Sequence, residues 1–126
     1  KQLVFEVKDI DYTSTDKKFL QQAIDVVNDH IADSEFSQTD FVNAMNVSRT
    51  VLTDKLKSLT GFTPTAFILN ARLTLSYKIV MEESDKIRVS DLAYSVGFSD
   101  AKYFSKKFKS KFGKSPKEVM DEKNGL

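Results

Sequence analysis

Several residue types are scarce or missing in this sequence. Among 126 residues there is no cysteine and only one histidine, His30. The lack of cysteine excludes disulfide bonds, thiolate metal sites and cysteine nucleophiles, and it is compatible with a reducing cytoplasm. No Ser-His-Asp set, glycine-rich phosphate loop or cluster of metal ligands is recognisable either. We therefore expect a protein that is not an enzyme and needs no metal or cofactor, with His30 in a structural role at a surface or boundary position.

Long apolar runs are missing as well. No stretch approaches the ~18 residues that a membrane span requires, and the first residues lack the apolar segment of a signal peptide. These absences predict a soluble, cytoplasmic chain without membrane contact. The chain starts at Lys1 rather than at a Met, which favours a piece of a longer polypeptide. Residues 1–15, in which Leu3, Phe5 and Val7 alternate as in a short strand, are predicted to be a linker from an upstream domain.

The net charge of +1 conceals an uneven distribution along the chain. Residues 1–35 hold four Lys and eight Asp or Glu, a net charge of −4. Residues 36–85 hold five charges of each sign, whereas residues 86–126 hold ten Lys or Arg and five acids, a net charge of +5. A basic third within a nearly neutral chain indicates binding to a polyanion such as nucleic acid.

An internal repeat fills most of the chain after one initial helix. Apolar residues recur at intervals of three and four from Asp16 onward, which predicts a helix capped by Thr15 or Asp16. The repeat that follows has an offset of 51 residues up to Ser99, which becomes 52 a few residues later. A repeat of this kind defines the architecture. Its matching motifs are Thr39-Asp40-Phe41, Val47-Ser48 and Gly61-Phe62-Thr63-Pro64 in the copy that starts at Phe36, and Ser90-Asp91-Leu92, Phe98-Ser99 and Gly113-Lys114-Ser115-Pro116 in the copy that starts at Ile87.

Each copy predicts a short helix, a tight turn and a longer helix. In the second copy the short helix spans residues 90–96, and Gly97 supplies the turn because a helix end commonly needs a positive φ. Ser99 is the predicted cap of the longer helix. In the first copy Asn46 replaces the glycine and Ser48 is the cap. This order of elements is a helix-turn-helix.

We therefore predict an all-α, homeodomain-like fold of about seven helices, in which a long linker helix joins two helix-turn-helix subdomains. Pro64 and Pro116 each lie in the first turn of a following helix, where proline sacrifices no hydrogen bond. The linker helix is expected from about Thr65 to Glu83, with an apolar stripe of Phe67, Ile68, Ala71, Leu75 and Ile79. The predicted boundaries are 16–64 for the first subdomain, 65–85 for the linker helix and 86–126 for the second subdomain.

Helical geometry separates the core from the free surface on the two longer helices. At ~100° per residue, each helix has one apolar stripe that is predicted core, namely Leu52, Leu56 and Leu59 in the first copy and Phe104, Phe108 and Phe112 in the second. The opposite face holds the same four positions in both copies. These positions are Thr50, Thr53, Asp54 and Lys57 in the first copy, and Lys102, Ser105, Lys106 and Lys109 in the second.

Such a face suits a recognition helix, whose first half lies in the major groove of DNA. Lysine donates to guanine, serine and threonine are adaptable, and aspartate accepts from cytosine N4. A lysine-rich helix is also commonly no more than a solvated surface, and Asp54 is alternatively an ion-pair partner of Lys57 or Arg49. The residues expected to contact phosphates are Ser48, Arg49, Lys57, Ser99, Lys107, Lys109, Lys111, Lys114 and Lys117.

Longer motifs in both copies connect the chain to a known family. The second copy contains Ile87-Arg88-Val89-Ser90-Asp91-Leu92-Ala93, Val96-Gly97-Phe98-Ser99-Asp100, Tyr103-Phe104-Ser105-Lys106-Lys107-Phe108-Lys109 and Gly113-Lys114-Ser115-Pro116; the first contains Val47-Ser48-Arg49, Leu52, Leu56-Lys57 and Thr60-Gly61-Phe62-Thr63-Pro64. From about Phe19 to Met120 the chain resembles the AraC/XylS family of transcription regulators. This resemblance implies a sequence-specific regulator domain that places two recognition helices in successive major grooves of double-stranded promoter or operator DNA.

The resemblance also implies which residues read DNA and which partners take part. Two residues depart from the family's pattern, because Asp54 stands where members often carry a basic or amide residue and Ala101 offers only a methyl group. Further implied partners are RNA polymerase and a second copy, through a dimer formed by the parent protein. Carried over by position, the base-contacting sites fall on Thr50, Thr53, Asp54, Ala101, Lys102, Ser105 and Lys106.

The N-terminal segment is similar to the end of hybrid two-component regulators. The similarity rests on a Tyr-Thr-Ser linker followed by Asp16-Lys17-Lys18-Phe19-Leu20. It implies a receiver or sensor domain upstream in the same chain, and a parent that is membrane-anchored if it is a hybrid sensor. One alternative function stays open. The low charge of residues 36–85, together with Asp54, also suits a protein-interaction module with only non-specific affinity for DNA.

Overall fold

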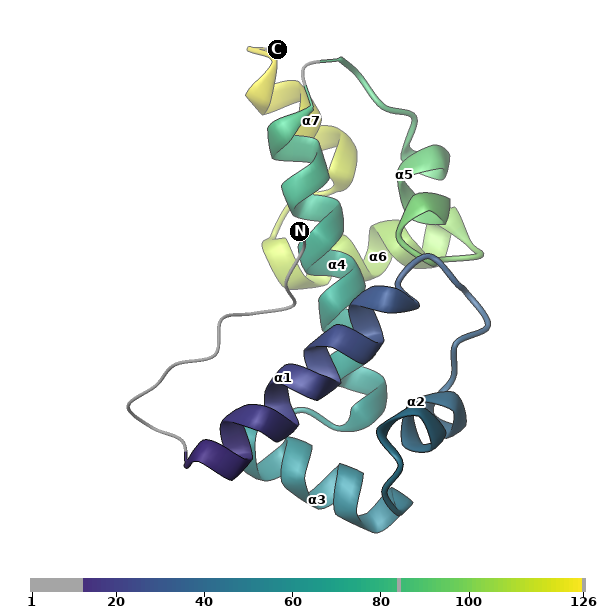
Figure 1. Cartoon of the computed structure of the whole chain (residues 1–126). Coiled ribbons are helices and arrows are strands. Elements are labelled where there is room, and N and C mark those ends of the chain that lie inside the picture. Colours follow the sequence, from purple (N-terminus) through teal and green to yellow (C-terminus); the bar gives the residue numbers. More distant parts are fainter. Residues whose placement is uncertain (1–12, 84, 126) are drawn as a thin grey trace. The chain divides into compact units, whose positions relative to one another are not determined.

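The computed structural model describes residues 13–83 and 85–125, and every regular element within them is an α-helix (Figure 1). The all-α prediction with about seven helices is therefore confirmed, whereas the predicted strand-like alternation at residues 3–7 lies outside the described residues. In chain order the helices are α1 (Ser14–Asp29), α2 (Gln38–Met45), α3 (Arg49–Thr60), α4 (Pro64–Glu82), α5 (Val89–Ser95), α6 (Ala101–Phe112) and α7 (Pro116–Lys123).

The chain divides into two compact units. We call them the first unit, which comprises residues up to Ile31 together with Glu35–Ala71, and the second unit, which comprises Ala32–Ser34 together with Arg72 onward. The division falls within α4, so its first half belongs to the first unit and its second half to the second. No described helix combines the length and the apolar character that crossing a membrane requires.

The first unit is built around an apolar core to which α1 to α4 all contribute. Helix α1 contacts both α2 and α3, and α2 contacts α3. The ring of Phe41 lies between those of Phe36 and Phe67, at centroid distances of 6.2 and 5.9 Å. The buried apolar residues are Phe19, Leu20, Ala23, Ile24, Val27, Phe36, Phe41, Met45, Leu52, Leu56, Phe67, Ile68 and Ala71.

The second unit has a core that is dominated by aromatic rings. Phe104 lies between Phe98 and Phe108, at centroid distances of 5.0 and 5.7 Å. Phe112 continues the row and packs 4.7 Å from both Phe108 and Tyr77 of α4. The remaining buried apolar side chains come from α4, α5 and α7 and from the turn before α6; they are Leu73, Val80, Leu92, Ala93, Val96, Pro116, Val119 and Met120.

The buried stripe of α4 differs from the predicted one in its second half. Leu75 and Ile79 are only half-buried, whereas Leu73, Ser76 and Val80 are buried. The Ser76 hydroxyl donates to the carbonyl of Leu73 at 2.7 Å, which explains how a polar side chain is accommodated there. The predicted stripe is therefore wrong at Leu75 and Ile79, because the second half of α4 contributes to a separate core with its own register.

The segment at residues 32–34 is held to α4 within the second unit. The guanidinium of Arg72 donates to the carbonyl of Asp33 at 2.7 Å. Partial burial of Arg72 lowers the pKa of its guanidinium, and the nearby Asp33 acts in the opposite direction. This bond therefore connects the segment between α1 and α2 to the partly buried guanidinium of Arg72.

The turn and cap residues that begin and end these helices agree only in part with the predictions. Asn46 adopts a left-handed conformation with φ of 58°, and Gly97 has φ of 93°, so both predicted turns are confirmed. Ser48 caps α3 by accepting from the amide of Val51, as predicted. Pro64 and Pro116 are each the first residue of their helix, also as predicted.

Two predicted caps are wrong. Helix α1 begins at Ser14, and its cap is the Thr13 side chain, which accepts from the amide of Asp16 at 3.1 Å. Thr15 and Asp16 therefore lie inside the helix. Helix α6 is capped by Asp100 rather than Ser99. The extra residue of the second copy lies before α6 and moves its start to Ala101, which leaves Ser99 one position too early.

Candidate nucleic-acid interface

Helix α3 presents the predicted free face of the first unit. Its cap at Ser48 sets the start of the helix, and burial of Leu52 and Leu56 fixes which side turns inward. Leu59 is half-buried and packs at the margin of the core. On the opposite side Thr50, Asp54 and Lys57 are exposed and Thr53 is half-buried. The structure therefore brings these four predicted residues together on one accessible face.

Helix α6 presents the equivalent face in the second unit. Phe104 and Phe108 are fully buried, while Phe112 is half-buried. The residues on the other side are Lys102, Ser105, Lys106 and Lys109, of which only Ser105 is half-buried. Ala101, the first residue of the helix, is half-buried as well. The same register thus produces the same kind of face in both units.

The start of α6 is held by a carboxylate. An Asp100 side-chain oxygen accepts from the backbone amides of Lys102 and Tyr103 at 2.8 and 3.2 Å. These amides would otherwise lack a partner within the helix. Because the carboxylate satisfies them, the first turn of α6 is fixed in position, and with it the side chains of the free face.

The lysines of α6 have different local surroundings. The ammonium groups of Lys107 and Lys111 lie 5.6 Å from the ring centroids of Tyr103 and Phe112, respectively. Lys102, Lys106 and Lys109 form no ion pair in the described part of the chain. A helix of twelve residues therefore carries five lysines and no acidic residue, and three of the five ammonium groups extend into solvent.

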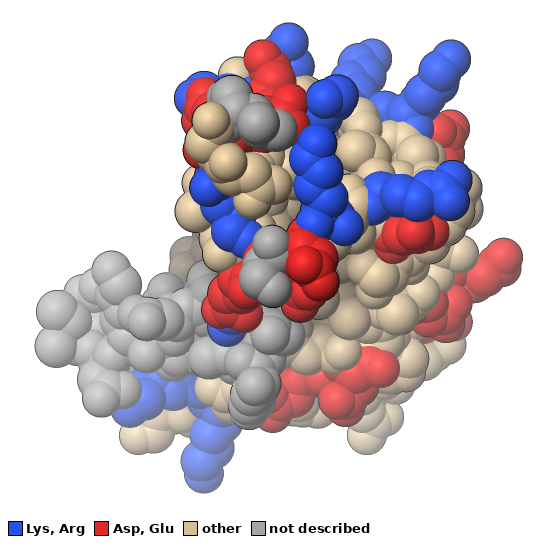
Figure 2. Space-filling model, turned by 90° about the horizontal axis from the view of Figure 1, so that it is seen from above, with Lys and Arg blue, Asp and Glu red and all other residues tan. Residues whose placement is uncertain are grey.

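Three lysines around α7 are paired with carboxylates. The ammonium group of Lys114 donates to Glu122, and this hydrogen bond is the main reason why the pKa of Lys114 is raised. Lys117 contacts Asp121 at 3.1 Å, and Lys86 approaches the same carboxylate at 3.8 Å. Figure 2 shows such mixing, with acidic side chains lying between several of the basic ones. Two predicted phosphate contacts, Lys114 and Lys117, thus already have counter-charges.

Arg49 is held near the start of two helices. Its guanidinium donates to the hydroxyl of Thr39 at 3.0 Å, so it lies close to the first turn of α2 while belonging to the first turn of α3. Helix N-termini favour anions because their free amides and dipoles are positive. An exposed cation at this place is well suited to a phosphate.

Asp54 has no ion-pair partner among the described residues. Arg49 bonds Thr39 instead, and no pairing joins Asp54 to Lys57 in this part of the chain. The alternative interpretation of Asp54 as an ion-pair partner therefore finds no support here. Its carboxylate is exposed and available to accept hydrogen bonds.

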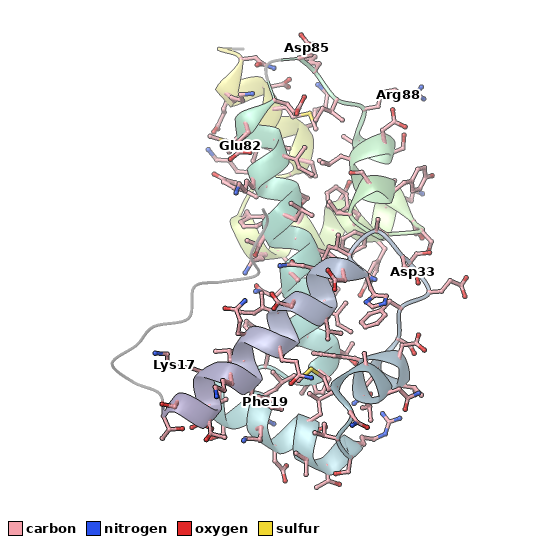
Figure 3. The ribbon with its side chains drawn as sticks, in the orientation of Figure 1. Lys17, Phe19, Asp33, Glu82, Asp85 and Arg88 are labelled. Atoms are coloured by element: carbon pink, nitrogen blue, oxygen red, sulfur yellow. The ribbon has the colours of Figure 1, made fainter. Side chains whose placement is uncertain are left out.

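The side chain of Lys55 on α3 contacts residues of α1. Its ammonium group lies 3.7 Å from a carboxylate oxygen of Asp16 and 4.9 Å from the ring centroid of Phe19. Figure 3 shows Phe19 on the part of α1 that lies beside α3. Lys55 therefore links the first turns of α1 to α3.

The sequence analysis did not identify two exposed apolar side chains that lie beside the free faces of α3 and α6. Val51 on α3 is 42% exposed and Tyr103 on α6 is 47% exposed, and the two occupy the same register in their helices. The helical wheel places each of them ~60° from a residue of the free face, Asp54 or Lys106. Their position beside a residue of the free face on the helical wheel could have identified them from the sequence.

His30 lies at a surface position, as the sequence predicted. It is exposed and ends α1, its Nδ1 lies 2.9 Å from the carbonyl of Val26, and its ring stacks on Phe36 at 4.4 Å. Within the described residues no group of three or more His, Cys, Asp or Glu side chains is placed to hold a metal ion.

Comparison with known proteins gives matches to a histidine kinase and to transcriptional activators. The chain is 38% identical over 113 residues to histidine kinase P4 of Formosa agariphila, which covers 90% of this chain and 8% of that protein. It is 31% identical over 93 residues to the transcriptional activator RhrA of Rhizobium meliloti, which covers 74% of this chain and 29% of the activator. The chain therefore spans only a small part of these relatives.

Solved structures with the same fold are DNA-binding domains. An AraC-type transcriptional regulator from Chromobacterium violaceum aligns with a TM-score of 0.75 and 22% identity, over 88% of this chain and 96% of the other. The DNA-binding domain of the transcriptional factor AdpA, solved in complex with a target DNA, aligns with a TM-score of 0.75 and 19% identity, over 84% of this chain and 93% of that domain.

The family described as a helix-turn-helix domain matches residues 41–122, which include the second helix-turn-helix copy up to α7 and most of the first copy. With this match over more than half of its length, the chain belongs to that helix-turn-helix family. Its fold is that of the AraC-type regulator from Chromobacterium violaceum.

Proposed function

We propose that this chain is the sequence-specific DNA-binding output domain of a transcription regulator, and that α3 and α6 enter successive major grooves of one duplex. The observation that carries the proposal is the repeated free face, which has the same register on α3 and α6. Recognition helices in the major groove contact base edges with their N-terminal residues. The proposed base contacts are Thr50, Thr53, Asp54, Ala101, Lys102, Ser105 and Lys106.

The two units would contribute differently to binding. The described residues of the first unit carry five Lys or Arg and six Asp or Glu, whereas those of the second carry twelve and nine, so their net charges are −1 and +3. Phosphate contacts produce salt-dependent affinity without reading sequence. We therefore assign most of the phosphate affinity to the second unit and a refinement of specificity to the first. The proposed phosphate contacts are Ser48, Arg49, Lys57, Ser99, Lys107, Lys109, Lys111, Lys114 and Lys117.

Two recognition helices on one face of a duplex would read sites about one helical turn, ~34 Å, apart. Reaching both grooves commonly requires some bending of the duplex, so the deformability of the DNA between the half-sites would add to specificity. In this proposal residues 16–64 and 86–126 are the two reading subdomains, residues 65–85 are the linker between them, and α4 (Pro64–Glu82) is the helix that joins them.

The rest of the parent protein would regulate DNA binding by this domain. The match to histidine kinase P4, of which this chain spans 8%, supports a receiver or sensor domain upstream in the same polypeptide. Phosphorylation in that part would govern how two output domains are presented to DNA as a dimer, and RNA polymerase would be the partner at the promoter. The output domain would act in the cytoplasm and would carry no enzymatic activity itself.

The test is selection of bound duplexes from a randomised pool at two salt concentrations, followed by sequencing. The proposal expects an enriched site with two short half-motifs about one helical turn apart. Substitution of Thr50 or Thr53 should alter one half-motif, and substitution of Lys102 or Lys106 the other. Retention that is salt-sensitive but without any enriched sequence would contradict a sequence-reading role for this chain.

A second candidate function follows from the first unit alone. Its near-neutral charge and the carboxylate of Asp54, which has no ion pair with any residue that the structure describes, also fit a surface that binds another protein. In that case the enriched site would contain a single half-motif that depends on α6, and substitutions at Thr50 and Thr53 would leave the selected sequence unchanged.

A further inference from the structure

Tyr103 is an exposed aromatic residue on the most basic helix of the molecule. It precedes the buried Phe104, and 47% of its surface is accessible to solvent. On the helical wheel it lies ~60° beyond Lys106, at the edge of the free face of α6 rather than at its centre. A side chain at that edge would meet the wall of the major groove, which is formed by the phosphate backbone.

The Tyr103 ring is held in place by its neighbours. Phe98 packs against it at a centroid distance of 6.2 Å, and the ammonium group of Lys107 lies 5.6 Å from its centroid. The backbone amide of Tyr103 is bonded to Asp100 at 3.2 Å. A ring supported in this way loses little conformational freedom on binding, so its hydroxyl is a preorganised hydrogen-bond donor.

The first unit lacks this arrangement at the same register. Val51 replaces the tyrosine and has no hydroxyl. Lys55 stands in the place of Lys107, but it contacts Asp16 and Phe19 of α1. The combination of a hydroxyl and a cation at the edge of the recognition face is therefore a feature of α6 that α3 does not share.

We infer that Tyr103 is a DNA-backbone contact, whose hydroxyl donates a hydrogen bond to a phosphate oxygen while Lys107 neutralises charge beside it. This inference rests on the proposed function and adds to it an anchoring residue that belongs to the second unit alone. Neutral side chains such as tyrosine commonly donate to phosphates, and such contacts fix the register of the protein on the duplex.

The test compares Tyr103→Phe with the unchanged chain. The Phe variant keeps the ring and its packing and removes only the hydroxyl, and its thermal unfolding should match that of the unchanged chain. The probes are the duplex selected from the randomised pool and a scrambled duplex of equal length, each titrated across a range of salt concentrations. Tyr94→Phe is the matched control, because Tyr94 is 54% exposed and lies on α5.

Loss of one hydrogen bond is expected to weaken binding by about 3- to 10-fold on both duplexes. The slope of log K against log salt should stay unchanged, because a neutral hydroxyl releases no counterion. Lys107→Gln should instead reduce that slope by about one unit. Tyr94→Phe should bind as the unchanged chain does.

Three results would overturn the inference while leaving the proposed function intact. The first is equal binding by Tyr103→Phe and the unchanged chain. The second is a loss of binding confined to the selected duplex, which would indicate base reading. The third is a loss of binding by Tyr94→Phe that equals the loss by Tyr103→Phe. Failure of the unchanged chain to bind either duplex would instead overturn the proposed function, and this inference with it.

Discussion

The exposed lysines of the second unit differ in what surrounds their ammonium groups. Lys106 lies on the free face of α6 without an ion pair in the described part of the chain, whereas Lys117 contacts Asp121 at 3.1 Å. An exposed ion pair contributes little to stability, but its carboxylate still reduces the field that a lysine offers to a phosphate. Two lysines that look alike in the sequence therefore differ in how strongly they attract a phosphate, because their neighbours in the fold differ.

We expect Lys106→Ala to weaken binding to the selected duplex more than Lys117→Ala does. Lys106 is proposed to reach a base edge, and loss of one good base contact costs about 1–3 kcal/mol of discrimination. Lys117→Ala should weaken selected and scrambled duplexes alike and only slightly. Dissociation constants for both duplexes measure this. Equal losses for the two variants on every sequence would show that Lys106 contacts phosphate only.

The cap of α6 at Asp100 can also be tested by substitution. Asp100→Ala removes the carboxylate that accepts from two backbone amides, and loss of such a cap typically costs about 0.5–2 kcal/mol. Ser99→Ala is the matched control, since Ser99 precedes the cap, and it should change stability little. Chemical denaturation of both variants measures the free energy of unfolding. A larger loss for Ser99→Ala would contradict the observed cap.

Two helices, α2 and α7, begin with a reciprocal capping box. In α7 the Ser115 side chain accepts from the amide of Glu118, and the Glu118 carboxylate accepts from the amide of Ser115 at 2.8 Å. That backbone hydrogen bond is the main reason why the pKa of Glu118 is lowered. Ser37 and Asp40 form the same arrangement in α2, where the pKa of Asp40 is also lowered. Both caps therefore depend on an ionised carboxylate.

Stability should fall in acid as these carboxylates become protonated. A carboxyl group whose pKa is lower in the folded state stabilises the fold above its unfolded pKa of about 4.3 for Glu, and this contribution disappears as the pH falls through the folded value. Glu118→Gln lacks this titration. The unchanged chain should therefore unfold at a higher temperature than Glu118→Gln at pH 7, with a difference that shrinks below about pH 4. A difference that is independent of pH would contradict this assignment.

The molecule as a whole consists of two units, each with its own core. Phe41 is fully buried among apolar residues of α1 to α4, and Phe108 lies in the aromatic row of the second unit. The same division separates a near-neutral unit from a basic one. Basic charge is therefore distributed unequally between the two units.

Separate cores predict separate responses to core mutations. Replacement of a buried phenylalanine by alanine typically costs about 3–5 kcal/mol. We expect Phe41→Ala to lower amide hydrogen-exchange protection mainly in α1, α2 and α3, and Phe108→Ala to lower it mainly in α5, α6 and α7. Exchange measured by mass spectrometry on the two variants checks this. A uniform loss along the chain in both variants would show that the units unfold together.

The sequence by itself determined the helices, the turns and the faces of the recognition helices. Apolar periodicity reflects which side of a helix is buried, so Leu52 and Phe104 could be placed in the core without coordinates. The turn at Asn46 was predictable because few residue types tolerate a left-handed conformation. The repeat also predicted that both recognition faces would share one register.

Only the tertiary structure decided details that depend on which neighbours a side chain meets. The start of α6 shifted to Ala101 because an extra residue was placed before the helix, so Asp100 rather than Ser99 reached the free amides. The second half of α4 joined a separate core, which buried Leu73 in place of Leu75. The pairing of Lys114 with Glu122 and the packing of Phe98 against Tyr103 likewise depend on how the turns before α7 and α6 fold back on these helices, because helical periodicity carries no information about the conformation of a turn.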